Sequence, residues 1–274
     1  MTPHVLILRA PGTNCDLETA FAFEKAGAKT ERLHVNRLLE NPAIFADFQI
    51  LCFPGGFSYG DDIASGRILA NQLHHHLSDE LMAFRDAGKL VLGICNGFQI
   101  LIKTGLLFPV HDDETPAATL AWNDCGRFQD HWVNLAVSPG TNSVFLRGIS
   151  ELYIPMAHAE GRFVTKDAAT LARLEAEGRL ALKYAPLPAT AWNPAPRGTY
   201  DEDGILSYPA NPNQAMGNVA GMCDETGRVL GLMPHPERHI DAVQHPHWTR
   251  MDEEKRPAEG AGLKMFRNAV EFFA

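Results

Sequence analysis

Short apolar runs alternate with longer amphipathic segments through the first half of the chain. Residues 4–8 (HVLIL), 48–56 (FQILCFPGG) and 88–95 (GKLVLGIC) carry apolar runs without alternation, as strands buried on both faces do. Residues 15–27, which end at a glycine, and residues 67–87 have the apolar spacing of amphipathic helices. The alternation predicts an α/β fold with a mostly parallel central sheet and helices on both faces.

The second half of the chain is richer in strand patterns and loops. A helix is predicted over 96–104, closed by Gly105, and a last amphipathic helix over 263–273. Four further segments have strand character, the last of them leading into a loop: 131–137, 152–158, 180–184 and 228–237. Two stretches rich in Pro, Gly or polar residues read as loops: 185–218 and 245–262. With no repeat or linker between these segments, we expect residues 1–274 to form a single domain.

Composition and charge narrow the class of protein. The formal net charge of −9 argues against nucleic acid or an anionic membrane as a bulk partner. No stretch reaches the roughly 18 apolar residues of a membrane span. The five cysteines are scattered without a CxxC pair, which favours a reducing cytoplasm over disulfides or a metal site. Three successive histidines, His74, His75 and His76, point in different directions on a helix, so a solvated face explains them better than a metal.

The sequence GICNG places Cys95 between a buried strand and a helix. Flanking glycines are typical of a nucleophile elbow, a tight turn where neighbouring Cβ atoms would clash. The helix N-terminus favours the thiolate, and the backbone N–H of Asn96 is then available to a developing oxyanion. The alternative is a buried structural cysteine at the end of a strand.

The stretch PGGFSYGD (54–61) follows a neighbouring strand of the predicted sheet. In a parallel sheet its start lies beside the end of the Cys95 strand, where such folds build their sites. The backbone amide of Gly56 is therefore a candidate second oxyanion donor. Taken alone, the same stretch is also compatible with a plain strand-to-helix turn.

A cysteine nucleophile needs a base, and two His-x-Glu pairs offer one. His235 and Glu237 follow an apolar strand, and prolines on both sides stiffen the histidine. His158 and Glu160 also follow a strand pattern, but Gly161 and the next residue resemble a binding loop. We favour His235 and Glu237, with the other pair left open.

GICNGFQ followed by a distant HPE resembles the class I glutamine amidotransferases, which use a Cys-His-Glu triad in that order. The resemblance extends to the glutaminase subunits of phosphoribosylformylglycinamidine synthase, a family in purine synthesis, and covers almost the whole chain. It rests on these stretches and their order: RAPGTNCDLE (9–18), FPGGFSYGDD (53–62), GICNGFQ (93–99), HAEGRF (158–163), NPN (211–213) and GRVLGLMPHPERH (227–239).

The resemblance implies a flavodoxin-like three-layer sandwich and a set of roles. Cys95 would form a thioester with glutamine, His235 would be its base and acid, and Glu237 would orient the imidazole. Gly56 and Asn96 would supply the oxyanion N–H groups.

The resemblance also implies a substrate and partners. Gln99, Phe57, His158 and Glu160 are the candidate glutamine-binding residues, the last two serving either substrate or partner. This chain would need no cofactor, because ATP and Mg²⁺ belong to a synthetase subunit. That subunit would use the released ammonia to convert formylglycinamide ribonucleotide to the amidine, with a small third subunit in split versions of the enzyme.

Alternatives remain at this stage. The elbow also fits a cysteine peptidase or chaperone of the related flavodoxin-like superfamily, although those generally lack a distant HPE. Two further alternatives are a glutaminase that serves another ammonia acceptor, and a scaffold subunit without catalytic activity. The chain departs from the family pattern at Ala10 and Ala159 and in longer stretches at 109–130 and 241–262. Cys15, at the start of a predicted helix, is either a reactive thiol or a structural residue.

Overall fold

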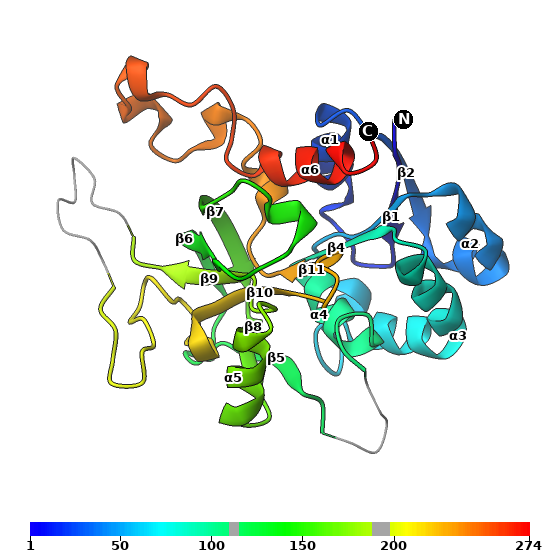
Figure 1. Cartoon of the computed structure of the whole chain (residues 1–274), viewed down its shortest axis with the longest axis horizontal. Coiled ribbons are helices and arrows are strands. Elements are labelled where there is room, and N and C mark those ends of the chain that lie inside the picture. Colours follow the sequence, from blue (N-terminus) through cyan, green and yellow to red (C-terminus); the bar gives the residue numbers. More distant parts are fainter. Residues whose placement is uncertain (110–114, 188–197) are drawn as a thin grey trace.

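One large sheet runs through the computed structural model, which describes residues 1–109, 115–187 and 198–274 (Figure 1). The strands are β1 (His4–Arg9), β2 (Lys29–His34), β3 (Ile50–Phe53), β4 (Leu90–Ile94), β5 (Ala118–Trp122), β6 (Gln129–Val137), β7 (Glu151–His158), β8 (Glu160–Thr165), β9 (Leu182–Ala185), β10 (Val219–Cys223) and β11 (Val229–Leu232). The α-helices are α1 (Asp16–Lys25), α2 (Val35–Glu40), α3 (Arg67–Asp86), α4 (Asn96–Thr104), α5 (Ala168–Ala176) and α6 (Leu263–Glu271).

The sheet has a parallel half and an antiparallel half. Its strand order is β2-β1-β3-β4-β11-β10-β9-β6-β7, and the pairings from β2 to β11 are all parallel. From β11 to β7 every pairing is antiparallel, and β5 and β8 form a separate two-stranded sheet. Strands β3, β4 and β11 are neighbours and parallel, so their carboxyl ends meet at one edge. The segments after them, which carry Gly56, Cys95 and His235, are thereby brought together.

Helices cover the parallel half on both faces, as the α/β pattern predicts (Figure 1). On one face α1 packs against α6, where the rings of Phe23 and Phe266 meet edge to face at 4.9 Å between centroids. On the other, α3 packs against α4. Helix α4 lies between the sheet and α3, which is why almost all of its residues are buried.

The predicted segments of the first half are confirmed, with bounds differing by a few residues, and α4 ends before Gly105 as expected. Strand β2 was not predicted because its residues are mostly polar and partly exposed, so it has no apolar pattern. Strands β5, β8 and β10 and helices α2 and α5 were also missed, and Gly161 lies in β8 rather than in a loop. Of the predicted loops and insertions, residues 110–114 and 188–197 lie outside the described residues. In the described part of the chain, no helix is both long and apolar enough to cross a membrane.

Candidate active site

The turn between β4 and α4 holds Cys95 in a conformation that few side chains adopt. Its φ of 51° and ψ of −108° cost about 1–3 kcal/mol of backbone strain. The two flanking glycines explain how the turn closes. A Cβ on Gly97 would lie 1.9 Å from the carbonyl oxygen of Phe53, and one on Gly93 would lie 2.7 Å from that of Gly97. The chain therefore has the tight strand-to-helix turn at Cys95 that GICNG predicts.

The elbow is fixed to the neighbouring strands by hydrogen bonds. The backbone N–H of Cys95 donates to the carbonyl of Leu232 at the end of β11 (2.8 Å). The thiol of Cys95 lies 3.6 Å from the carbonyl oxygen of Ala157 in β7. Asn96 is the first residue of α4, so its N–H has no acceptor within the helix. The thiol thus sits at a helix N-terminus beside an unused backbone donor.

His235 and Glu237 form a short, buried pair next to this turn. His235 Nδ1 and Glu237 Oε1 are 2.6 Å apart, and the residues are only 2% and 1% exposed. The backbone N–H of His235 donates to Pro155 (2.7 Å), and Pro236 begins a short 3-10 turn that carries Glu237 back toward the ring. Burial lowers the pKa of His235, but the Glu237 carboxylate and the Cys95 thiol outweigh it and hold that pKa well above its ordinary value. Nε2 of this histidine has no partner among the described residues.

The side chain of Asn96 joins the elbow to the PGGFSYGD loop. It accepts a hydrogen bond from the N–H of Ser58 (3.1 Å) and donates to Asp61 (3.0 Å) and Gln99 (2.9 Å). Gly56, within this loop, has φ +147° and no room for a Cβ, which would lie 2.8 Å from the backbone of Asn14. Asn96 thus holds the Ser58 and Asp61 end of this loop against the elbow.

The other predicted substrate residues surround the same network. The Gln99 side chain is buried, and its amide nitrogen donates to the carbonyl oxygen of Glu160. The Glu160 carboxylate accepts the N–H of Ser65 (3.1 Å). Phe57 is 45% exposed, with its ring 6.5 Å from that of Phe128. Gln99 and Glu160 are therefore held within the protein, whereas Phe57 lies at the surface.

His158 has partners unlike those of His235. Its Nδ1 lies 3.1 Å from Oδ1 of Asn123, and the Asn123 amide also donates to the carbonyl of His158 (2.8 Å). Complete burial, together with the charge of His235, lowers the pKa of His158 to about 3, so its ring is neutral. Glu160 does not contact this ring but bonds Ser65 instead. The structure thus gives a histidine–carboxylate pair at 235 and 237 and none at 158 and 160.

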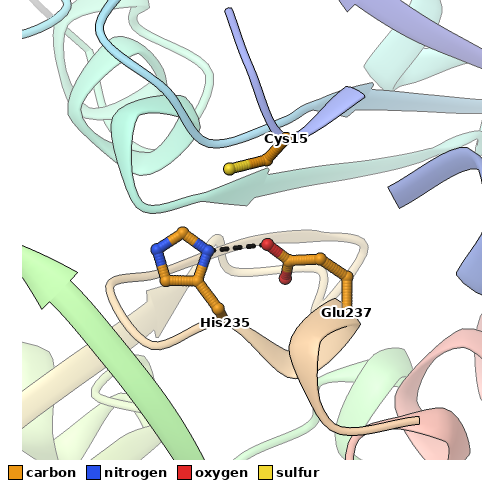
Figure 2. A group of neighbouring side chains, drawn as sticks. All are labelled: Cys15, His235 and Glu237. Atoms are coloured by element: carbon orange, nitrogen blue, oxygen red, sulfur yellow. Dashed lines mark hydrogen bonds and ion pairs between the residues drawn. The ribbon is translucent and has the colours of Figure 1, made fainter. Parts of the chain in front are cut away.

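Cys15 is a buried thiol beside His235. The sequence alone did not predict that it lies there. Its Sγ, a ring nitrogen of His235 and a carboxylate oxygen of Glu237 all lie within 4.8 Å of one another (Figure 2). Arg238 also reaches it, with Nη2 3.0 Å from Sγ. Burial raises the pKa of the Cys15 thiol, although hydrogen bonding to His235 opposes that rise. Residues 9–15 carry no local signal for this contact, because it arises from β11 and β1 sharing one edge of the sheet.

Comparisons with known proteins identify the family of this chain. Residues 2–273 match the family model of the CobB/CobQ-like glutamine amidotransferase domain. The phosphoribosylformylglycinamidine synthase subunit PurQ of Dehalococcoides mccartyi is 45% identical, with 97% of this chain and 96% of that protein covered. PurQ of Methanococcus maripaludis (strain C5) is 39% identical over 100% of this chain and 99% of its own length.

A solved structure leads to the same family. The structure of PurLQS from Thermotoga maritima contains a chain that matches with a TM-score of 0.68 and 27% identity, each chain covered over 100% of its length. The chain therefore belongs to the glutamine amidotransferases, within the family of phosphoribosylformylglycinamidine synthase PurQ subunits.

Proposed function

We propose that Cys95, His235 and Glu237 carry the glutaminase activity of this chain. As a member of its family, the chain is the glutaminase subunit of phosphoribosylformylglycinamidine synthase. The observation that supports the triad is a strained cysteine at a helix N-terminus beside a buried histidine–glutamate pair 2.6 Å apart. These are the nucleophile, base and orienting acid that acyl transfer needs.

In the first half of the reaction, the Cys95 sulfur attacks the side-chain amide carbon of glutamine and its proton passes to Nε2 of His235. Glu237 holds the proton on Nδ1, which leaves the Nε2 lone pair free to accept. The carbonyl oxygen becomes an oxyanion that the N–H groups of Asn96 and Gly56 stabilise. The C–N bond then breaks, the Nε2 proton goes to the leaving nitrogen, and ammonia and a thioester result.

In the second half, water attacks the thioester carbon and gives its proton to His235. The C–S bond breaks, the sulfur regains a proton from Nε2, and glutamate leaves. The raised pKa of His235 favours the two steps in which the ring accepts a proton, because the imidazolium that forms is stabilised.

The remaining predicted residues act on the substrate through the framework of the site. The side chain of Gln99 donates to β8 and accepts from Asn96, so both ends of its amide are already bonded. We therefore assign Gln99 the role of shaping the glutamine pocket rather than of hydrogen bonding to the substrate. Glu160 holds the residues that lead into α3 through Ser65. Phe57 and His158 are candidate walls of the pocket, one exposed and one neutral.

Ammonia released here is passed to a synthetase subunit, where ATP and Mg²⁺ act in converting formylglycinamide ribonucleotide to the amidine. The similarity to the chain in PurLQS supports a complex with that subunit and a small third subunit. Five unpaired cysteine thiols favour a cytoplasmic location. The continuous sheet favours a single amidotransferase domain over residues 1–274.

The test of the triad is Cys95→Ser in the full complex. Glutamine-dependent synthesis should be abolished, whereas ammonia-dependent synthesis should continue, because only ammonia release needs the thiolate. Cys125→Ser, at an exposed cysteine, is the matched control and should retain both activities. Glutamine use by Cys95→Ser at the unsubstituted rate would rule out this assignment.

A further inference from the structure

Three ligand atoms of types that bind transition metals converge beside the catalytic turn. Cys15 comes from the loop before α1, and His235 and Glu237 come from the segment after β11 (Figure 2). The sulfur, a ring nitrogen and a carboxylate oxygen lie within 4.8 Å of one another, and all three residues are buried. The mechanism above uses His235 and Glu237 but assigns no step to Cys15.

The cluster has unused ligand capacity. Oε2 of Glu237 is buried and has no hydrogen-bond partner among the described residues. The Cys15 thiol donates to the side-chain oxygen of Asn14 (3.3 Å) and its sulfur accepts from Arg238 (3.0 Å), so a thiolate there would lose the first contact and keep the Arg238 donor. Gly55 lies against the cluster, since a Cβ on it would be 2.8 Å from Cε1 of His235 and 3.0 Å from Sγ of Cys15.

We propose that Cys15, His235 and Glu237 form an inhibitory binding site for a divalent cation of the zinc class. Thiolate, imidazole and carboxylate are the three ligand types of zinc, whereas Mg²⁺ and Ca²⁺ prefer oxygen alone. A tetrahedral zinc ion places its ligand atoms about 3.3–3.7 Å apart, so side-chain shifts of about 1 Å close the site. The two negative charges of Cys15 and Glu237 balance the ion, and water can take the fourth position.

The ion would stop the reaction by fixing the wrong tautomer of His235. Nδ1 is the nitrogen that faces Glu237, and the metal would take its lone pair in place of the Nδ1–H bond. The single proton of the neutral ring must then sit on Nε2, while the Cys15 proton leaves to solvent. Nε2 can no longer accept the Cys95 proton. This consequence rests on the proposed triad, but the binding itself does not.

Binding is measured first, on the full chain without its partner. Co²⁺ is the probe, because a thiolate ligand gives a near-ultraviolet charge-transfer band, and Zn²⁺ should displace it. The band should appear in the unsubstituted chain, in Cys125→Ser and in Cys95→Ser. In Cys15→Ser the band should vanish and the affinity for Zn²⁺ should fall at least about tenfold. Loss of a residue that only supports a metal ligand already lowers metal affinity by about that factor, and Cys15 is itself a ligand.

The variants separate this site from simpler ones. A band that survives in Cys15→Ser but is lost in Cys95→Ser would overturn the proposal, because the ligands would then be the nucleophile and Nε2. Absence of the band from the unsubstituted chain would overturn it too. A circular dichroism melt of each variant shows whether lost binding reflects lost folding.

Inhibition is measured second, in the full complex with glutamine. Zn²⁺ should inhibit glutamine-dependent synthesis, and removal of the ion with a chelator should restore it. Ammonia-dependent synthesis at the same Zn²⁺ concentration shows whether the ion inhibits the synthetase subunit instead. Cys15→Ser should need at least about tenfold more Zn²⁺ for the same fractional inhibition of its own activity. Equal sensitivity of Cys15→Ser and Cys125→Ser would overturn the inhibitory role. If the metal binds as expected but Cys95→Ser keeps its glutamine-dependent activity, the proposed triad is refuted and the metal site is not.

Discussion

Residues 158–160 and 235–237 both place a histidine two positions before a glutamate, and both follow a strand of the same sheet. After β11, a proline begins a 3-10 turn that returns Glu237 to the His235 ring. After β7, the chain bends only at Ala159 and continues into β8, so His158 meets Asn123 and Glu160 meets Ser65. One buried imidazole therefore has a carboxylate to stabilise its charge and the other has an amide.

The electrostatic result follows from those partners. Burial disfavours the charged form of both rings. Beside Glu237 that effect is outweighed and the pKa of His235 is raised, whereas nothing offsets burial at His158 and its pKa falls to about 3. A proton carrier needs the first environment, so two histidines with identical spacing to a glutamate differ in their environment only in three dimensions.

Replacing each histidine by alanine should give the largest contrast. His235→Ala should lower glutamine-dependent kcat by about 10²–10⁴-fold, because the general base is lost. His158→Ala should change glutamine affinity or coupling to the partner more than kcat. Steady-state glutaminase kinetics in the complex provide the measurement, with ammonia-dependent synthesis as the control for the partner. The reverse pattern would move the base to His158.

A methyl group pressed against each ring should sharpen the same contrast. Gly55→Ala would crowd the His235 ring at 2.8 Å, and Gly161→Ala would crowd the His158 ring at 2.3 Å. We expect Gly55→Ala to lower kcat by about 10²-fold, as a displacement near 1 Å can do. Gly161→Ala should instead lower the free energy of unfolding by about 1–3 kcal/mol, as overpacking does.

Kinetics and urea denaturation of both variants test this pair. Gly140→Ala is the control, because a Cβ there has only ordinary contact at 3.8 Å. If both ring-crowding variants lose stability equally and keep kcat, the two histidines have equivalent roles and the comparison fails.

Acid should destabilise the fold partly through His158. Its pKa of about 3 in the folded protein lies below the ordinary value of 6.5, so the unfolded chain binds the proton first as pH falls. The stability from the neutral ring is fully present above about pH 6.5 and is lost toward pH 3, with a slope of at most about 1.4 kcal/mol per pH unit. Other groups titrate in this range, so the difference between variants is the useful quantity.

His158→Asn should flatten that slope, because the amide does not titrate. Urea denaturation at several pH values between 4 and 7 provides the comparison, with His76→Asn on the exposed surface of α3 as the control. A slope unchanged by His158→Asn would mean that the buried ring does not govern acid stability.

The smallest effect is expected at Ala159, the bend between β7 and β8. This residue has no positive φ, so the turn does not need glycine. Ala159→Gly should lower the free energy of unfolding by about 0.5–1 kcal/mol through backbone entropy and leave kcat unchanged. A large gain in activity would show that the bend limits the site.

Much of this protein follows from local sequence. The apolar runs of β1, β3 and β4 and the spacing of α3 and α4 mark buried strands and amphipathic helices, because burial on one or both faces sets the pattern. The glycines of GICNG predict the tight turn, since no larger residue than Gly97 fits beside the Phe53 carbonyl. The prolines on both sides of His235 favoured the pair at 235 and 237, and the structure brings His235 Nδ1 within 2.6 Å of Glu237.

Other features were decided by tertiary structure alone. Strand β2 lies at the edge of the sheet with charged side chains, so pairing with β1 rather than composition makes it a strand. The Asn96 network joins Ser58 and Asp61 of one loop to helix α4, and no single segment encodes it. Cys15 reaches His235 across more than two hundred positions of sequence because the parallel strands end at one edge. The sequence determined which reactive side chains this protein has. The fold determined which of them form hydrogen-bonded pairs, because hydrogen bonding and burial depend on distances that only packing sets.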